Sequence, residues 1–126
     1  MAFTDYLETK LLAHTFSNTA FTSPGTVYVA LYTVAPTDSS AGTEVSGGSY
    51  ARQSAAFTTS GNTASNTSAI EYPTATAGYG TVVAVAVLDS LSGGNMLAYA
   101  ALSANKTIAT GDVFRIPAGD LDITLN

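Results

Sequence analysis

Two apolar runs separated by a cluster of turn-forming residues stand in the middle of the sequence. Residues 79–88 read YGTVVAVAVL, residues 96–102 read MLAYAAL, and DSLSGGN lies between them. Short runs of branched, aromatic and small apolar residues flanking Gly, Ser, Asn and Asp favour a β-hairpin. The pattern predicts a hairpin from Tyr79 to Leu102. Because its two arms are the most continuously hydrophobic segments of the chain, we expect the core to be built on them.

Residues 3–16 (FTDYLETKLLAHTF) are the segment with helical periodicity. The residues that recur at spacings of three and four positions are Phe3, Leu7, Leu11 and His14. Two acidic residues in the expected first turn favour the start of a helix there. Such a short helix is marginal by itself, so we expect its apolar face to lie on the sheet or on a neighbouring subunit. We expect His14 to be a packing residue at the helix end.

The next apolar segment is residues 26–34 (TVYVALYTV). If it forms a strand, neither of its two faces is polar. A strand with two apolar faces belongs inside a sandwich or has one face against a partner. Residues 35–48 follow it and are rich in Pro, Gly, Ser and Asp. We expect no regular structure there, and a loop of this length is typically functional or ordered by a partner.

Weaker alternation predicts strands over residues 49–57 and 67–72, with a turn over residues 58–66 between them. Arg52 falls in the middle of the first of these strands, where a guanidinium group needs an acceptor. We expect it to pair with Glu44 or Glu71 of its own chain. An intersubunit salt bridge is the alternative.

The chain ends with the turn TGD and the run VFRIPAGDLDITL. Leu121, Ile123 and Leu125 alternate with polar residues, which indicates a half-buried strand. About seven or eight short strands with frequent turn signals are typical of a β-sandwich or a jelly-roll-like fold. We therefore predict an all-β fold with one short N-terminal helix, and a single domain over residues 1–126 with the helix at 3–16 and the β-sandwich at 26–126.

The amino-acid composition adds one observation, which is that the chain has few charged residues. Only 10% of the 126 residues are charged and the net charge is −5, whereas about 25% of residues are charged in ordinary soluble domains. Four basic residues are too few for a phosphate-binding patch, which argues against nucleic acid. Either other subunits cover part of the surface or the chain is a Ser- and Thr-rich monomer. The chain has no Cys. No cationic segment followed by an apolar run opens it and no apolar run reaches the ~20 residues that span a membrane, so we expect neither signal-dependent secretion nor membrane insertion.

Candidate chemistry is sparse. Asp120 and Asp122 lie on one strand face and could hold Ca²⁺ together with Asp112 or Asp38, but carboxylates in such positions are ordinarily solvated. The G-x-S-x-G motif of a nucleophile elbow is absent, and no helical pattern or GK[ST] follows the Gly-Gly pairs, so they are not phosphate loops. We therefore assign no catalytic residue, no cofactor and no metal ligand, and predict that the protein is not an enzyme.

Four segments together resemble a family of small virion proteins of tailed bacteriophages. They are AFTDYLETKLLAHTF, VYVALYTVAPTDSSAGTEVSGGSYARQ, VLDSLSGGNMLAYAAL and GDVFRIPAGDLDITL. The most specific parts are Thr43–Gln53 and Thr110–Ile123, and the likeness covers nearly the whole chain. Tyr79 stands where the family often has Trp before Gly-Thr. Members are commonly labelled tail fibre proteins, and the resemblance implies a fold similar to the trimeric β-sandwich modules of phage fibres and capsid decoration proteins.

The resemblance implies a non-enzymatic structural protein of the virion. We expect a homotrimer that decorates and stabilises the capsid shell, with the major capsid protein as its main partner. The alternative is a tail fibre or a receptor-binding module that binds a host surface glycan, for which Tyr32, Tyr50 and Tyr99 could stack on sugars. The candidate subunit contacts are Phe3, Leu7, Leu11, Thr43, Glu44, Val45, Tyr50 and Arg52.

Overall fold

The computed structural model describes residues 1–125, which form one helix and eleven strands. The helix is α1 (Asp5–Phe16). The strands are β1 (Ala2–Phe3), β2 (Val27–Val34), β3 (Thr43–Glu44), β4 (Gln53–Ala55), β5 (Phe57–Ser60), β6 (Thr63–Asn66), β7 (Ile70–Glu71), β8 (Gly80–Leu88), β9 (Met96–Ile108), β10 (Arg115–Ile116) and β11 (Asp122–Thr124). The prediction of an all-β fold with one short N-terminal helix is confirmed.

The predicted central hairpin is the middle of the largest sheet. Strands β8 and β9 pair antiparallel, and β9 continues past the predicted end of the hairpin to Ile108. The sheet has the order β1-β9-β8-β2-β3, and β4 also pairs with β2. Large and small side chains face each other across it, since Tyr32 pairs with Ala84 and Ala86 with Tyr99. These pairs lie on one face of the sheet, where the small residues make room for the tyrosine rings.

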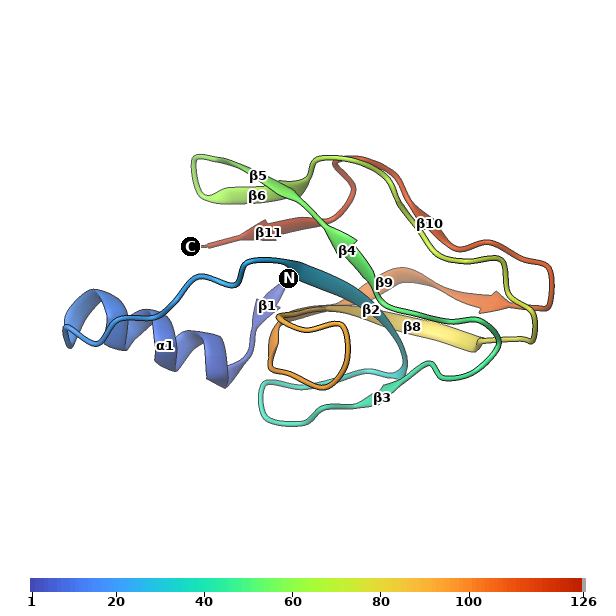
Figure 1. The fold of residues 1–126 in the computed structure, drawn as a ribbon, viewed down its shortest axis with the longest axis horizontal. Coiled ribbons are helices and arrows are strands. Elements are labelled where there is room, and N and C mark those ends of the chain that lie inside the picture. The colour runs from blue at the N-terminus through green and yellow to red at the C-terminus, as the bar shows by residue number, and fades with distance from the viewer. Residues whose placement is uncertain (126) are drawn as a thin grey trace.

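A second layer covers one face of this sheet. It consists of the three-stranded sheet β11-β6-β5 and the two-stranded sheet β10-β7, and Figure 1 shows β5, β6 and β11 grouped together above β1 and β2. The buried apolar side chains between the layers belong to both. They include Val29, Leu31, Val82, Val85 and Val87 from the main sheet and Ile70, Tyr72, Phe114, Ile116 and Leu121 from the covering layer.

The opposite face of the main sheet is covered by a loop of the same chain. This face carries a smaller cluster of buried residues that includes Ala30, Tyr32, Ala84 and Ala86. The Tyr99 hydroxyl donates to the Asp38 carboxylate, so the segment that follows β2 reaches across the sheet. The prediction of no regular structure over residues 35–48 is wrong at β3, whose two residues pair with β2.

The predicted turn over residues 58–66 is wrong, because this segment forms the hairpin of β5 and β6. Thr and Ser residues occupy its strands, so no apolar alternation reveals them, but Thr favours extended backbone. Gly61, at φ +59°, supplies the tight turn. The strand predicted over 49–57 begins later, at Gln53, and the strand predicted over 67–72 shrinks to β7.

The C-terminal strand β11 has the predicted alternation only in part. Leu121 is buried and Ile123 is half-buried, but Leu125 is exposed. The break at Pro117 and Gly119 is confirmed, since the chain turns there between β10 and β11. Asn66 holds this corner: its amide donates to the Pro117 carbonyl at 3.0 Å and its side-chain oxygen accepts from the Leu121 N–H at 2.9 Å.

Helix α1 forms where the sequence predicts it but begins at Asp5, because Phe3 belongs to strand β1. Thr4 caps the helix, accepting from the Leu7 N–H at 3.4 Å, and its hydroxyl donates to the Met96 carbonyl at 2.6 Å. The helix start is therefore fixed to β9. From that point α1 extends away from the sheets, and the chain returns alongside it before entering β2 (Figure 1).

Candidate functional site

The segment Thr43–Gln53 folds around an ion pair between Glu44 and Arg52. The Arg52 guanidinium donates to both Glu44 carboxylate oxygens, at 2.9 Å from Nε and 2.8 Å from Nη2. Its remaining terminal nitrogen, Nη1, donates to the carbonyls of Ser90 at 2.8 Å and Gly93 at 2.9 Å. The prediction that Arg52 pairs within its own chain is confirmed, with Glu44 as the partner. The pair clamps this segment to the turn of the central hairpin.

Tyr50 completes this network. Its hydroxyl donates to Glu44 at 2.6 Å and accepts from the Leu31 N–H at 3.1 Å. The ring stacks on Tyr72, with centroids 6.0 Å apart and an angle of 9° between planes. Tyr72 in turn donates from its hydroxyl to the Val29 carbonyl at 2.6 Å. A column of aromatic rings thus joins the clamped segment to the core.

Burial and hydrogen bonding in this network shift the pKa values of its titratable side chains. Burial raises the pKa of Tyr50, and its hydrogen bond to the Glu44 carboxylate raises it further. Burial also raises the pKa of Tyr32, to about 12, with a further contribution from the charge of Glu44. Burial alone would raise the pKa of Glu44, but the hydrogen bonds from Arg52 and Tyr50 and the charge of Arg52 lower it overall. The folded chain therefore favours an ionised Glu44 beside neutral tyrosines.

The eight candidate subunit contacts fall into two groups in the structure. One group, at β3 and the segment after it, consists of Thr43, Glu44, Val45, Tyr50 and Arg52. Glu44, Tyr50 and Arg52 bond to one another within the chain, and Val45 is buried in the core. Phe3, Leu7 and Leu11 lie at or near the base of α1 and are half-buried. Contact of either group with another subunit stays a prediction.

Two of the three tyrosines considered as sugar platforms are unsuited to that role. Tyr32 is only 3% exposed, and the ring of Tyr50 is stacked on Tyr72. Stacking on a sugar needs an open ring face. Tyr99 is half-buried, and its hydroxyl is already bonded to Asp38, a hydrogen bond that raises the pKa of Tyr99.

The candidate ion-binding carboxylates do not converge. Within residues 1–125 there is no group of three or more His, Cys, Asp or Glu side chains placed to hold a metal ion. Asp122 accepts from the Ser65 hydroxyl at 2.5 Å, and Asp112 caps the turn before it by accepting from the Ala109 N–H at 2.9 Å.

Within residues 1–125, no helix has the length and apolar character needed to cross a membrane.

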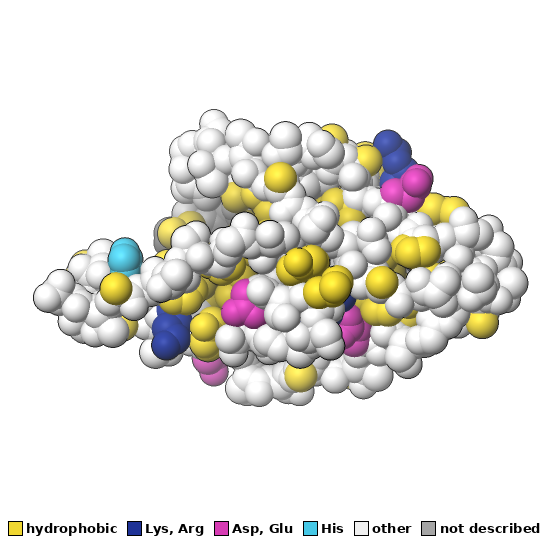
Figure 2. All heavy atoms as spheres, in the orientation of Figure 1, with side chains coloured by type: hydrophobic (Ala, Val, Ile, Leu, Met, Phe, Trp, Pro, Cys, Tyr) yellow, Lys and Arg dark blue, Asp and Glu magenta, His cyan; other side chains and the backbone are white. Residues whose placement is uncertain are grey.

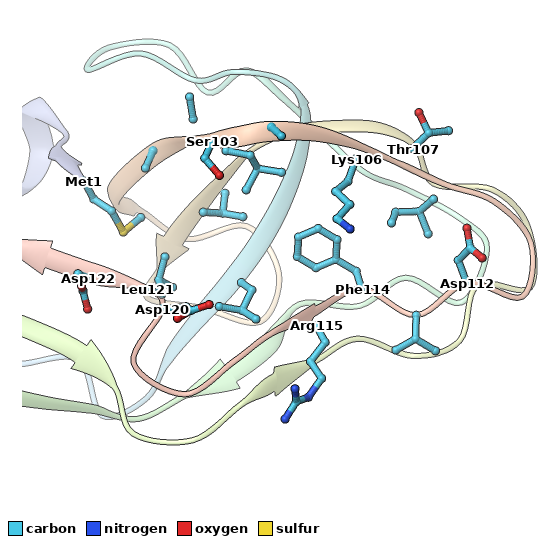
Figure 3. Close-up of a pocket in the computed structure, with 18 residues that line it drawn as sticks. Met1, Ser103, Lys106, Thr107, Asp112, Phe114, Arg115, Asp120, Leu121 and Asp122 are labelled. Atoms are coloured by element: carbon cyan, nitrogen blue, oxygen red, sulfur yellow. The ribbon is translucent and has the colours of Figure 1, made fainter.

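Two open grooves of similar volume lie beside the sheets, and the first follows the edge of β9. This edge groove, of about 830 Å³, is bounded by β9 and by the segment that carries β10. Figure 3 shows Lys106 and Phe114 pointing into the space between these segments, while Arg115 points away. The residues that give it its character are Leu102, Lys106, Asp112, Phe114, Asp120 and Leu121. It is apolar at its floor and charged at its rim.

The second groove lies between the layers at the end where α1 leaves the sheets. The sheets and their connections, residues 27–125 with β1, are called the body below. This end groove has a volume of about 710 Å³, and the residues that line it carry no charge. Hydrophobic side chains are visible in the hollow beside the projecting helix in Figure 2. Its apolar lining includes Phe3, Leu7, Val27, Ala55, Phe57 and Ile123. The sequence pattern gave no sign of it, because its walls come from seven separate segments.

Helix α1 and the returning residues 17–26 form an arm beside the end groove. No residue of α1 is buried, and two of its large apolar side chains, Leu12 and Phe16, are 59% and 79% exposed. The arm projects from the body in Figure 2. The prediction that the helix buries one apolar face holds only for Leu7 and Leu11, which are half-buried. His14 is exposed, and its Nδ1 accepts from the Phe21 N–H at 3.0 Å.

A β-rich body whose prominent surfaces are apolar grooves and a projecting arm describes a structural or binding module. The sequence matches the family described as Podophage GP4 fiber I protein gp80 over residues 2–124, and the chain belongs to this family. No curated protein matches the sequence. The family places the chain among the structural, fibre-like proteins of the tailed-phage virion.

Proposed function

We propose that this chain is a structural subunit of a phage tail fibre. The observation that carries the proposal is the family match, which covers residues 2–124 and whose description names a fibre protein. The chain would act by binding other virion proteins rather than by catalysis. This location differs from the capsid shell expected from the sequence, because the family description favours the tail.

The structure supports an assembly role through its unequal surfaces. The clamp of Glu44 and Arg52 and the column of tyrosines make the body rigid. The arm and the two grooves, in contrast, leave apolar surface uncovered. Exposed apolar surface of this kind is typical of protein–protein contact sites. A rigid body with open contact surfaces suits a subunit that is built into a larger particle.

Capsid decoration is the second candidate, and the low charge of the chain favours it. With 10% charged residues, the surface offers little electrostatic repulsion to the neighbouring subunits of a shell. Under this alternative the main partner is the major capsid protein, and the arm would bridge capsid subunits. Binding of a host surface glycan would belong to the tail location, and Tyr99 is the candidate there, since it is half-buried whereas Tyr32 is buried and Tyr50 packs against Tyr72 and Tyr79.

Localisation in the particle tests the proposal. Purified virions carrying an epitope tag at an exposed turn, such as Gly61, would be imaged by cryo-electron microscopy with bound antibody fragments. We expect label at the tail, with few copies per particle on a stained gel. Label over the whole shell with many copies per particle would overturn the fibre proposal in favour of decoration.

A further inference from the structure

The edge groove is a gap in the side of the sandwich. One of its walls is formed by β9 between Ala100 and Ile108, and the segment that carries β10 forms the other. Several side chains that line it are buried members of the main core cluster, namely Val85, Ile108, Phe114, Ile116 and Leu121. The two layers of the body therefore do not close over the core along the outer edge of β9.

Strand β9 lacks a neighbouring strand along this gap. On one side it pairs with β8 as far as Ile108, and on the other it pairs with β1 at Ala98 and Tyr99. Within residues 1–125, no strand pairs with the outer edge of β9 beyond Tyr99. The open edge of a strand presents backbone N–H and C=O groups to an incoming strand. This wall of the groove thus fits an extended polypeptide backbone.

Strand β1 shows how a strand at this edge fills the space between the layers. Met1 and Phe3 are half-buried, whereas Ala2 between them is exposed. Met1 packs against the main core cluster and lines the edge groove, and Figure 3 shows it at the opposite end of the groove from Asp112. A strand that continued the line of β1 along β9 would therefore place every second side chain in the gap.

The charges around the edge groove select among extended segments. The carboxylates of Asp112, Asp120 and Asp122 line the groove, and Lys106 points into it whereas Arg115 points away (Figure 3). A basic segment is therefore attracted and an acidic segment repelled. A second copy of this chain is a poor donor, because its net charge is −5 and its strands, within the described residues, are all paired in its own sheets.

We propose that the edge groove receives an extended segment of another virion protein, which adds a strand to β9 in line with β1. Apolar side chains at alternate positions of this segment enter the gap, and basic side chains lie on its solvent face. The register of β9 on β8 shifts between Ala101 and Lys106, and such a bulge limits the backbone pairing of an added strand. The alternating side chains must therefore supply most of the affinity. The proposal is independent of whether the chain lies in the tail or on the capsid.

Titration of the isotope-labelled full chain with designed peptides tests the proposal. The probe is Lys-Val-Thr-Val-Lys-Val-Thr with blocked ends, and its control, Lys-Val-Val-Lys-Thr-Thr-Val, has the same composition without the alternation. We expect the probe to shift the amide NMR signals of residues 100–108 and 112–116, and to bind at least about tenfold more tightly than the control. No binding, equal affinities, or shifts centred on the end groove would overturn the proposal.

Two matched comparisons distinguish this groove from other apolar surface. Replacing both Lys residues of the probe by Glu should weaken binding severalfold, because three carboxylates line the groove. Val113→Ser, at a 47% exposed position that lines the groove, should also weaken it, whereas Leu91→Ser, at a 57% exposed position in the β8–β9 turn, should not. The NMR spectrum of each variant verifies its fold. Equal binding of the Lys and Glu peptides, or equal effects of the two variants, contradicts the proposal.

A strand supplied by the same chain tests the register of the site. Val-Lys-Val-Thr added directly before Met1 would place both Val side chains in the gap, in step with Met1 and Phe3, whereas Lys-Val-Thr-Val would turn them to solvent. Tethering gives either extension a high effective concentration at the groove. We expect the first to raise the thermal midpoint by about 5 °C or more over the second, and to block binding of the probe peptide. Equal midpoints and unhindered peptide binding would contradict an added strand in line with β1.

Discussion

The body buries its apolar side chains in a core, whereas the arm has no buried residue in its helix. In the body, strands β2 and β8 have both faces covered, and Val29, Ala30 and Leu31 are fully buried in succession. In the described residues, no buried side-chain nitrogen or oxygen lacks a hydrogen-bond partner. In the arm, α1 buries none of its residues. The difference teaches that the core of the body is built within one chain, whereas the arm leaves the large apolar side chains of Leu12 and Phe16 exposed.

Substitution in the core should have the largest effect on stability. We expect Leu31→Ala to lower the free energy of unfolding by about 3–4 kcal/mol, because it opens a cavity at a fully buried position. Leu12→Ala, the same change on the arm, should shift the stability of the body by no more than about 0.5 kcal/mol. Urea denaturation followed by circular dichroism would measure both. Equal effects would mean that the arm is part of the folding core.

Breaking the clamp should have the next largest effect. Glu44→Gln leaves the guanidinium of Arg52, whose side chain is 9% exposed, without its charged partner, and we expect a loss of about 3 kcal/mol. A variant that pairs less well but keeps the charge, Arg52→Lys, should lose less. If Glu44→Gln lowered the free energy of unfolding by less than Arg52→Lys does, the ion pair would not be the main element of the clamp.

The same cluster predicts how stability depends on pH. The folded pKa of Glu44 lies below its ordinary value of 4.5, so its contribution is present above pH 4.5 and is lost as the pH falls through the folded pKa. The folded pKa of Tyr32 is raised from 10.0 to about 12, so stability should fall as the pH rises above 10. Urea midpoints measured across this range should show a plateau with losses at both ends. In Glu44→Gln the acid-side loss should be smaller.

Two glycines give a smaller and sharply matched comparison within the body. Gly48 and Gly61 have φ of +61° and +59°, but a Cβ on Gly48 would lie 2.4 Å from the Ala77 carbonyl oxygen, whereas one on Gly61 meets nothing within 4 Å. Both Ala variants bear the cost of a left-handed backbone, about 1 kcal/mol. We expect Gly48→Ala to cost at least about 1 kcal/mol more, by thermal denaturation. Equal losses would show that the contact with Ala77 relaxes freely.

The parts of the fold that the sequence predicted are those with an apolar pattern. The hairpin of β8 and β9, strand β2 and helix α1 all carry such a pattern. The β5–β6 hairpin was missed because its strands consist largely of Thr and Ser, and their order comes from cross-strand pairing such as Thr59 with Ala64. Arg52 was correctly placed in its own chain because an ion pair follows from local charge.

The candidate contact surfaces were less predictable. Helical spacing grouped His14 with Leu7 and Leu11 and overlooked Leu12 and Phe16, since a periodic pattern draws attention to one face only. The end groove joins segments as distant as Leu7 and Ile123, and no local pattern encodes such an arrangement. What the sequence did contain was the adjacent pair Leu11 and Leu12, since neighbouring residues of a helix point about 100° apart.

Amide hydrogen exchange tests most directly the claim that the body is packed within one chain while the arm is not. Exchange of the purified full chain would be followed by mass spectrometry on peptides from residues 5–26 and from β8. Since α1 has no buried residue and β8 lies in the core, we expect exchange to be at least severalfold faster in the arm than in β8. Equal protection of the two segments would contradict this contrast.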